Sequence, residues 1–263
     1  MKKILLAATC FFAANFTQAQ LKINEFSCAN FNTLADNFGE YNDWVEIFNS
    51  GSSAVPLTGF YLSDDAGDPT KYQFPATAPS VPAGGVVRVW CSSRDIVFGS
   101  NVHTNFKLTQ CKPEEIVLSS SSGSMVDSVH LRRNQESHSW GRNPDGSATW
   151  SVYTTPTAAA LNSTGTPLQP YATTPVFSVA AGFYSGAQNV SITSPDPGVT
   201  IYYTVDGSEP TTASTVYSSP VNVTGVRVIR ARAFSSNAAI PASFIESNTY
   251  FIGVTHTITT ISV

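Results

Sequence analysis

The sequence predicts an all-β protein built of two antiparallel β-sandwiches in tandem. Short apolar runs alternate with period two: Val45 and Ile47 alternate with Trp44, Glu46 and Phe48, which is the pattern of a half-buried strand. Gly, Pro, Asn and Asp separate such runs at short intervals, with little helical periodicity between them. A length of 263 residues is enough for two ordinary domains.

The N-terminal residues 1–19 predict a secretory signal peptide that is cleaved before Gln20. They begin with two lysines, continue through an apolar run from Ile4 to Phe16, and end in small residues before the cut. A lipoprotein attached through Cys10 is the less favoured alternative, because the usual leucine is missing from Ala7-Ala8-Thr9. We therefore expect a secreted or cell-surface, extracytoplasmic protein with no stable membrane span.

The formal net charge of −4 excludes one class of partner. Nucleic-acid binders carry a basic patch or stripe, whereas the lysines and arginines here are few and scattered. We expect no DNA or RNA partner.

The first domain is expected over residues 20–163. Its strands are predicted around 21–27, 44–48, 57–63, 71–74, 86–90, 106–108, 116–118 and 125–129, with a long polar loop at 92–105 and a hairpin at the serine-rich turn around Gly123-Ser124. Residues 164–174, TGTPLQPYATT, have two prolines and no charge, and predict a linker.

The second domain is expected over residues 175–252, and a strand-like tail over 253–263. Strands are predicted around 175–177, 182–184, 190–192, 201–205, 221–223 and 226–234. We expect the tail to be an edge strand or the start of a further domain.

Motifs in the first half resemble a known family. The runs INEF, DWVEIFN, PLTGFYLSDD, VPAGG, FKLT, EEIVLS, VDSV, SWGRNPDG and TPTAAALN follow one another between residues 21 and 162. In this order they resemble the lamin-tail domain, which implies an immunoglobulin-like β-sandwich found in nuclear lamins and in secreted bacterial proteins.

Motifs in the second half resemble a second family. The runs IYYTVDGSEPT, YSSPVNVTG, VIRARAF and TYF resemble the C-terminal accessory β-sandwich of chitobiase and β-hexosaminidase, which is also seen as a fibronectin-like module. The resemblance implies a secreted multidomain protein, and such proteins often continue into a kinase-like domain related to spore coat protein H (CotH).

Three cysteines remain after the leader: Cys28, Cys91 and Cys111. An oxidising compartment predicts one disulfide, and the spacing leaves all three pairings open, with a slight preference for Cys91 with Cys111. Metal binding is the weaker interpretation, because CxxC pairs are missing and the four histidines lack ligand spacing.

Two groups of carboxylates are candidates for chemistry. Glu40, Asp43 and Glu46 cluster in sequence, but a solvent-exposed strand explains them better than acid–base catalysis does. Another group, Asp64, Asp65 and Asp68 around Gly67, offers oxygen ligands to Ca²⁺, but its spacing is not that of an EF-hand, so turn formation is the expectation.

Basic and aromatic groups give two further candidates. His130, Arg132, Arg133 and His138 form the only basic cluster, for which an exposed loop is favoured over an anion site. Aromatic side chains suited to sugar stacking are Phe183, Tyr184, Tyr202, Tyr203 and Trp150, although packing in the core is the favoured interpretation for each of them. Strand alternation places one of Tyr202 and Tyr203 inside the sandwich and the other outside.

The sequence therefore predicts a non-catalytic binding, adhesion or presentation protein whose partner is a protein or glycan ligand at the cell surface. We expect no cofactor and no catalytic or metal-binding residue, since GxSxG and GxxxxGK[ST] are missing. The alternative is an accessory region of a larger secreted enzyme, CotH-like or carbohydrate-active, whose catalytic domain lies downstream.

Overall fold

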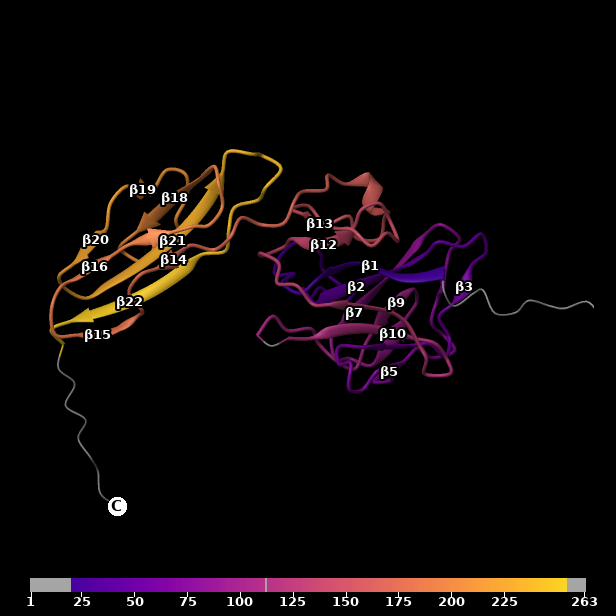
Figure 1. The fold of residues 1–263 in the computed structure, drawn as a ribbon. Coiled ribbons are helices and arrows are strands. Elements are labelled where there is room, and N and C mark those ends of the chain that lie inside the picture. Colours follow the sequence, from indigo (N-terminus) through magenta and orange to yellow (C-terminus); the bar gives the residue numbers. More distant parts are fainter. Residues whose placement is uncertain (1–19, 112, 255–263) are drawn as a thin grey trace, which may run out of the picture. The chain divides into compact units, whose positions relative to one another are not determined.

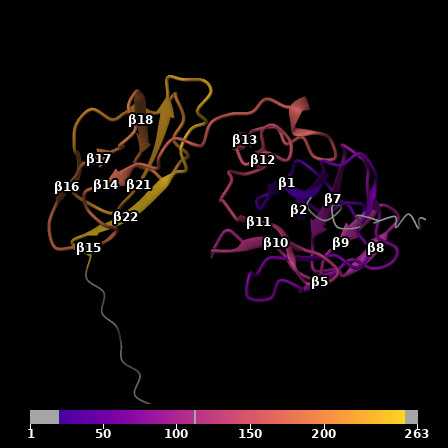
Figure 2. The same cartoon turned by 45° about the vertical axis from the view of Figure 1, so that its right-hand side comes forward.

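The computed structural model describes residues 20–111 and 113–254 and divides the chain into two compact units. The first, here unit 1, ends at Pro167, and the second, unit 2, begins at Leu168. Both are all-β over the described residues, where the one short helix is a 3-10 turn at Asn162–Thr164 (Figures 1 and 2). The predicted signal peptide and most of the predicted tail lie outside the described residues.

Unit 1 has two layers. The larger is a seven-stranded sheet, and the smaller is a four-stranded sheet. In spatial order the larger sheet contains β13 (Trp150–Tyr153), β12 (Ser139–Arg142), β1 (Leu21–Ser27), β2 (Asp43–Asn49), β7 (Val86–Cys91), β9 (Asn101–His103) and β8 (Ile96–Phe98). The smaller contains β11 (Met125–His130), β10 (Glu115–Ser119), β4 (Tyr61–Ser63) and β5 (Tyr72–Gln73), and β3 (Val55–Pro56) pairs separately with β6 (Ser80–Val81).

Strand β2 lies at the centre of the larger sheet. It pairs antiparallel with β1 on one side and with β7 on the other. The alternation predicts a half-buried strand, and this prediction is wrong, because Trp44 through Asn49 are all buried. A strand with neighbours on both sides and a covered second face has no solvent-exposed row.

The cover over that second face is residues 155–165, here called the closing segment. Asn162 is buried, and its amide Nδ2 donates to Asn24 O at 3.1 Å and to Arg142 O at 2.9 Å. A Cβ at Gly141 would lie 2.6 Å from this amide nitrogen, so glycine is required for the close approach. Glu25 and Glu46 beneath the segment are thereby removed from solvent.

The structure confirms some of the other strand predictions for unit 1 and contradicts others. The predicted strand 21–27 is confirmed, and so is the hairpin at Gly123, which joins β10 and β11 with φ of 79° at the glycine. The prediction of a long loop over residues 92–105 is wrong, because this segment contains the β8–β9 hairpin. Strand β9 extends the larger sheet and runs parallel to β7. Residues 106–108 form no strand.

Unit 2 is organised around a five-stranded sheet. Its spatial order is β15 (Gly182–Tyr184), β22 (Glu246–Ile252), β21 (Arg227–Ser235), β18 (Val199–Thr204) and β19 (Thr215–Val216). Two ribbons complete the unit: β14 (Val176–Phe177) with β17 (Ile192–Thr193), and β16 (Gln188–Val190) with β20 (Val221–Val223).

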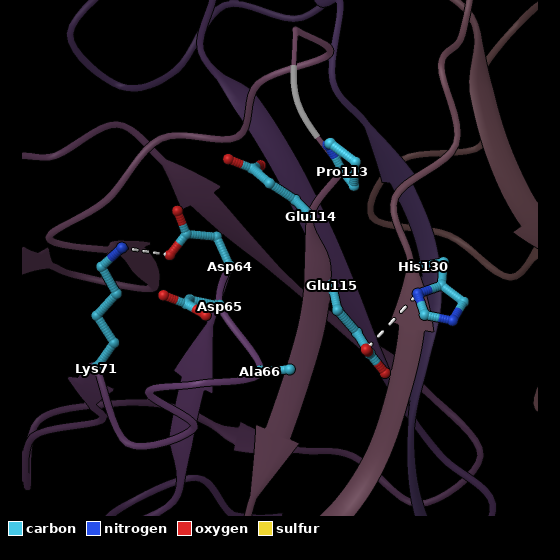
Figure 3. A pocket seen from close by; sticks show the side chains of 8 residues that line it. All are labelled: Asp64, Asp65, Ala66, Lys71, Pro113, Glu114, Glu115 and His130. Atoms are coloured by element: carbon cyan, nitrogen blue, oxygen red, sulfur yellow. Dashed lines mark hydrogen bonds and ion pairs between the residues drawn. The ribbon is translucent and has the colours of Figure 1, made fainter.

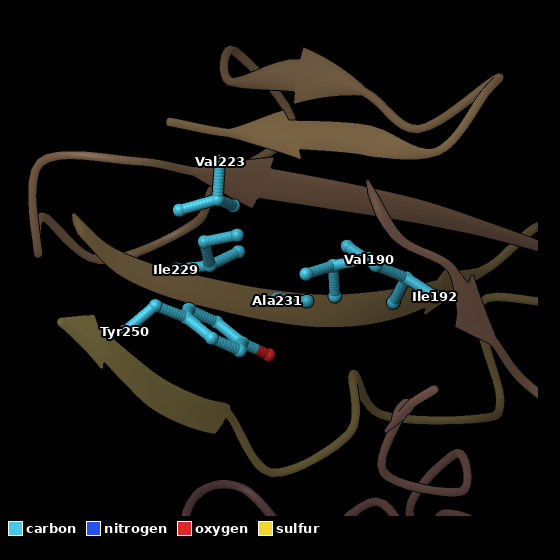
Figure 4. Close-up of a cluster of buried hydrophobic side chains, with 6 residues drawn as sticks. All are labelled: Val190, Ile192, Val223, Ile229, Ala231 and Tyr250. Carbon is cyan, nitrogen blue, oxygen red and sulfur yellow. The ribbon is translucent and has the colours of Figure 1, made fainter. Parts of the chain in front are cut away.

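The core of unit 2 lies on one face of this sheet. Ile229 and Ala231 of β21 and Tyr250 of β22 meet Val190, Ile192 and Val223 from the ribbons (Figure 4). Tyr203 packs against this cluster, while Tyr202 contacts Phe234 on the opposite face with ring centroids 5.4 Å apart. The prediction that strand alternation separates the two tyrosines is confirmed.

The second part of the predicted linker lies against unit 2. Gln169 N–H donates to Ala239 O at 2.8 Å, and Ala172 N–H donates to Pro241 O at 2.9 Å. The Tyr171 ring meets Phe244 edge-on with centroids 5.1 Å apart.

A search of the described residues for membrane-spanning helices finds none of sufficient length and apolar character.

Candidate binding sites

An acidic hollow of about 420 Å³ lies in unit 1 where the β4–β5 turn meets the start of β10. Four carboxylates line it, together with one lysine, one histidine, Ala66 and Pro113 (Figure 3). The charged lining residues are Asp64, Asp65, Lys71, Glu114, Glu115 and His130.

Internal pairs neutralise only part of this charge. Lys71 Nζ lies 2.6 Å from Asp64 Oδ1, and His130 Nδ1 lies 3.6 Å from Glu115 Oε2. Glu114 accepts the backbone N–H of Thr109 at 2.9 Å. The hollow therefore presents net negative charge and favours cationic groups.

The aspartates considered for calcium do not converge. Asp64 points to Lys71, and Asp65 Oδ1 accepts the N–H of Gly67 at 2.8 Å within its own turn. Asp68 N–H closes the turn onto Asp65 O at 3.1 Å. In the described part of the chain no three His, Cys, Asp or Glu residues are grouped so as to hold a metal ion.

The structure separates the three carboxylates of the Glu40 cluster. Glu40 is exposed and pairs with Arg94, Nη2 to Oε1 at 2.7 Å, which lowers its pKa. Asp43 lines a second hollow, and burial raises its pKa to about 6. Glu46 is fully buried, so the expectation of an exposed strand is wrong for it.

Glu46 belongs to a row of charged residues that crosses three strands. The sheet register pairs it with Glu25 on β1 and with Arg88 on β7. Burial, and then the nearby charge of Glu25, raise the pKa of Glu46 to about 8, and burial also raises the pKa of Glu25. Two adjacent buried carboxyls favour a protonated form of Glu46 at neutral pH.

The closing segment supplies most of the hydrogen bonds of this row, and Ser139 of β12 donates another to Glu25 Oε1. Thr157 Oγ1 donates to Glu25 Oε2 at 2.6 Å, and Ala159 N–H donates to Glu46 Oε1. Among the described residues Glu46 Oε2 has no hydrogen-bond partner, and neither has Arg88 Nε. The Arg88 guanidinium lies 4.3 Å from the centroid of the Trp90 ring. The two carboxyl groups of the row are fully buried, and their hydrogen bonds hold the closing segment in place.

The fold brings Ser92, His103 and Asp36 together, which the sequence did not predict. Ser92 Oγ lies 2.9 Å from His103 Nδ1, and the same nitrogen lies 4.0 Å from Asp36 Oδ2. His103 Nε2 bonds Asn37 Oδ1 at 2.8 Å instead of a carboxylate. A catalytic triad needs the serine and the carboxylate on opposite ring nitrogens, and His103 is fully buried.

This trio therefore anchors the loop before β2. Burial lowers the pKa of His103, which keeps the ring neutral. Asp36 Oδ1 accepts the N–H groups of Phe38 and Glu40 at 2.8 and 3.0 Å, so the loop closes on itself. The contact between Ser92, His103 and Asp36 joins residues that are far apart in the chain, so no local sequence pattern predicts it.

The basic cluster is dispersed. His130 pairs with Glu115, whereas the Arg132 guanidinium lies 5.2 Å from the Trp140 ring centroid and 5.9 Å from that of Trp150. Burial lowers the pKa of Arg132. The Trp150 ring is contacted by Arg132, Arg142 and Phe26, so it packs within unit 1.

In unit 2, aromatic side chains gather on the sheet face away from the core. Phe183 pairs in register with Phe251, and their rings stack at 4.6 Å with 14° between planes. Phe183 is 57% exposed. Tyr202 and Phe234 form the second pair, and Tyr184, which points inward, packs against the core.

The predicted disulfide is wrong, because Cys28, Cys91 and Cys111 are free. Cys28 follows the Ser27–Trp44 pair, and Cys91 pairs with Asp43, so β2 lies between the two thiols. Two strand spacings put such residues about 9–10 Å apart, beyond the 7 Å or so that a disulfide spans. Cys28 Sγ instead donates to Asn134 Oδ1 at 2.9 Å, and Cys111 is exposed.

Two family models match the chain in the predicted order. The Lamin Tail Domain matches residues 15–133, and the chitobiase/beta-hexosaminidase C-terminal domain matches residues 179–243. Both resemblances are thereby confirmed. Strands β12 and β13 lie beyond the first match but belong to the same sheet as β1. No curated protein matches the chain.

Proposed function

From a lamin tail domain followed by a chitobiase-type C-terminal domain, we propose that this chain is a secreted or cell-surface binding protein without catalytic activity. It would present or attach ligands through the surfaces of its two sandwiches. The single observation that supports this most directly is the open aromatic face of unit 2.

That face has the features of a shallow binding surface. Phe251 lies one residue beyond Tyr250, which pairs with Arg227, so it sits level with Val226, the residue just before β21. Phe234 is eight positions along the same strand, which separates the two aromatic pairs by about 26 Å. Arg230 and Arg232 lie between them and bond Gly207 O and Glu209 Oε1. An extended polymer fits this spacing better than one small molecule does.

The ligand class we propose for this face is a glycan. Aromatic rings at an exposed surface stack on apolar ring faces, and weak single contacts give affinities in the micromolar to millimolar range. A second candidate function is an accessory region that positions a carbohydrate-active or CotH-like catalytic domain, which the chitobiase-type match favours.

Polysaccharide pull-down with the purified chain tests the proposal. We expect retention on at least one polysaccharide and loss of it in the double variant Phe183→Ala with Tyr202→Ala. Phe98→Ala, which removes a 63% exposed ring from unit 1, is the matched control and should bind normally. Equal retention of all three proteins would contradict a role for the aromatic face.

A screen with generic esterase, phosphatase, kinase, nuclease and glycosidase substrates tests the absence of catalysis. We expect no turnover. Turnover that survives repurification and disappears with one point substitution would overturn the non-catalytic proposal.

A further inference from the structure

A second hollow of unit 1, about 250 Å³ in volume, opens where β1 ends, β2 begins and β7 ends. Asp43 lines it between the thiols of Cys28 and Cys91, and Phe31, Tyr41 and Lys107 line it from the neighbouring loops. Burial raises the pKa of Cys28 to about 12 and that of Cys91 well above its ordinary value, so both thiols are neutral. Asp43 is thus the acidic group of the hollow.

The Asp43 carboxylate has one oxygen available. Its Oδ1 accepts the N–H of Asn30 at 3.2 Å. Oδ2 has no hydrogen-bond partner among the described residues, and it is not sealed from solvent as Glu46 Oε2 is. A carboxylate oxygen that lines a hollow without a partner accepts a donor from a ligand at little desolvation cost.

Two aromatic side chains line the same hollow as this carboxylate. Phe31 is 65% exposed and Tyr41 is 51% exposed, and both line the same hollow. Neither ring contacts another ring or a cation in the described part of the chain. Aromatic faces next to a carboxylate attract a cation, because the ring quadrupole adds to the carboxylate charge.

We propose that this hollow binds the ammonium group of a lysine side chain from a protein partner. A volume of 250 Å³ is below the range of about 300–1,000 Å³ for drug-sized ligands, and suits one side chain. The single free oxygen matches a point donor, whereas a guanidinium fork needs two acceptors for its bidentate bonds. A quaternary ammonium has no N–H to give to Oδ2.

Lys107 of the chain itself lines the hollow and acts as a competitor. Its charge lowers the pKa of Asp43, although burial outweighs it, and the two side chains form no ion pair within the described residues. An incoming ammonium must displace this charge. Replacing Lys107 by methionine therefore strengthens binding, which a merely structural role of the hollow does not predict.

The site lies in unit 1 and is independent of the aromatic face of unit 2, so one proposal can fail while the other stands. The probe is Nα-acetyl-lysine N-methylamide, titrated into the whole isotope-labelled chain at pH 7.5 and followed by NMR. We expect saturable shifts at the amides of Ala29, Asn30 and Asn42. The norleucine analogue, which lacks the ammonium, should give none.

Four variants define the site. Asp43→Asn should weaken binding about tenfold, as the loss of one charge-assisted hydrogen bond does. Phe31→Ala should weaken it about threefold, and Lys107→Met should strengthen it about threefold. Asp68→Asn, which removes an exposed carboxylate from a turn, is the charge-matched control and should leave affinity unchanged.

The pH profile adds a readout that folding defects do not mimic. Since the pKa of Asp43 is about 6, affinity should fall as pH drops through 6 and Asp43 becomes protonated. Glu114 and Lys107 are the other charged groups that act on it. Binding by the norleucine analogue, tighter binding of the trimethyl-lysine analogue, or unchanged affinity in Asp43→Asn would each overturn the proposal.

Discussion

The interiors of the two units differ in chemistry. Unit 1 buries ionisable and amide side chains throughout its sheets, among them Glu25, Glu46, His103 and Asn162. In unit 2, Ser243 is the one polar side chain that is buried within the described residues. The core there is apolar and includes Ile229, Ala231 and Tyr250.

This difference shows two ways of holding a sandwich together. In unit 1, hydrogen bonds between residues far apart in the chain hold loops that have no strand pattern in their sequence. One example is Asn134 Oδ1, which accepts the N–H of Cys28, 106 positions away. Each such bond is costly to break, because the remaining partner stays buried without one. Unit 2 depends on backbone pairing and a small apolar cluster, which has little sensitivity to pH.

The largest effect is expected from the core of unit 2. Tyr250→Ala should lower the free energy of unfolding of unit 2 by about 3–5 kcal/mol, because a fully buried ring leaves a cavity in a small core. Amide exchange along β21 measures it. Tyr250→Phe, which loses only the bond from the hydroxyl to Val179 O, should cost about 1 kcal/mol. Equal costs for the two variants would contradict the cavity explanation.

The next effect concerns the polar network of unit 1. Asn162→Ala should cost about 2–3 kcal/mol, since it leaves the buried carbonyls of Asn24 and Arg142 without their donor. Tryptophan fluorescence reports this unit alone, because Trp44, Trp90, Trp140 and Trp150 all lie in it. The matched control is Asn222→Ala in unit 2, followed by amide exchange along β21, because its exposed bond to Asn189 should contribute little. A similar loss of stability in this control would contradict the difference between the two units.

A third prediction uses pH. Glu46 has a folded pKa of about 8 against 4.5 ordinarily, so between pH 6.5 and 8 the unfolded state is ionised while the folded state keeps the proton. Stability of unit 1 should therefore fall as pH rises across this window, by about 1.4 kcal/mol per pH unit. His103, whose pKa burial lowers from 6.5, acts in the opposite direction, since its unfolded state still binds protons near pH 6.5, but this contribution fades as pH rises toward 8.

Glu46→Gln should flatten this slope, as measured by denaturant titration with tryptophan fluorescence at several pH values. Unit 2, followed by amide exchange along β21, is the internal control: the carboxyl pKa shifts resolved there, at Asp196 and Asp206, are downward through hydrogen bonds, so both groups stay ionised in this window. A persistent slope in Glu46→Gln would assign the effect to another group.

The smallest effect is expected at a surface ion pair of unit 2. Glu209→Gln breaks the contact of Arg232 Nη1 with Glu209 Oε1 at 2.9 Å, but the glutamate is 58% exposed. Exposed pairs contribute little because water and salt screen them, so the change should stay within about 0.5 kcal/mol. Thermal unfolding of unit 2 checks it, and a loss above 2 kcal/mol would show that this unit also depends on charged contacts.

Much of the fold follows from local pattern. Alternation and turn residues predicted the all-β class and strand β1 to its bounds. They also predicted that Tyr202 and Tyr203 lie on opposite faces of the sheet, but not which of the two faces the core. Successive side chains of a strand point to opposite faces because of the backbone geometry, so this alternation can be predicted from the sequence alone.

The candidate sites were less predictable. The carboxylates of Glu40, Asp43 and Glu46 are neighbours in sequence, but lie in three environments because one is in a loop, one at a strand end and one under the closing segment. The contact of Ser92 with His103 depends on the parallel placement of β9 beside β7, which the polar composition of residues 92–105 concealed.

The sequence by itself determined the strand-rich class, the two modules and their order, because these depend on side-chain periodicity and short motifs. Only the tertiary structure decided which polar side chains are buried, that the three thiols stay free, and where Asp43 meets Phe31 and Tyr41. The reason is physical: burial and pairing depend on which strands become neighbours and on what covers their faces, and both are set by contacts between residues far apart in the chain.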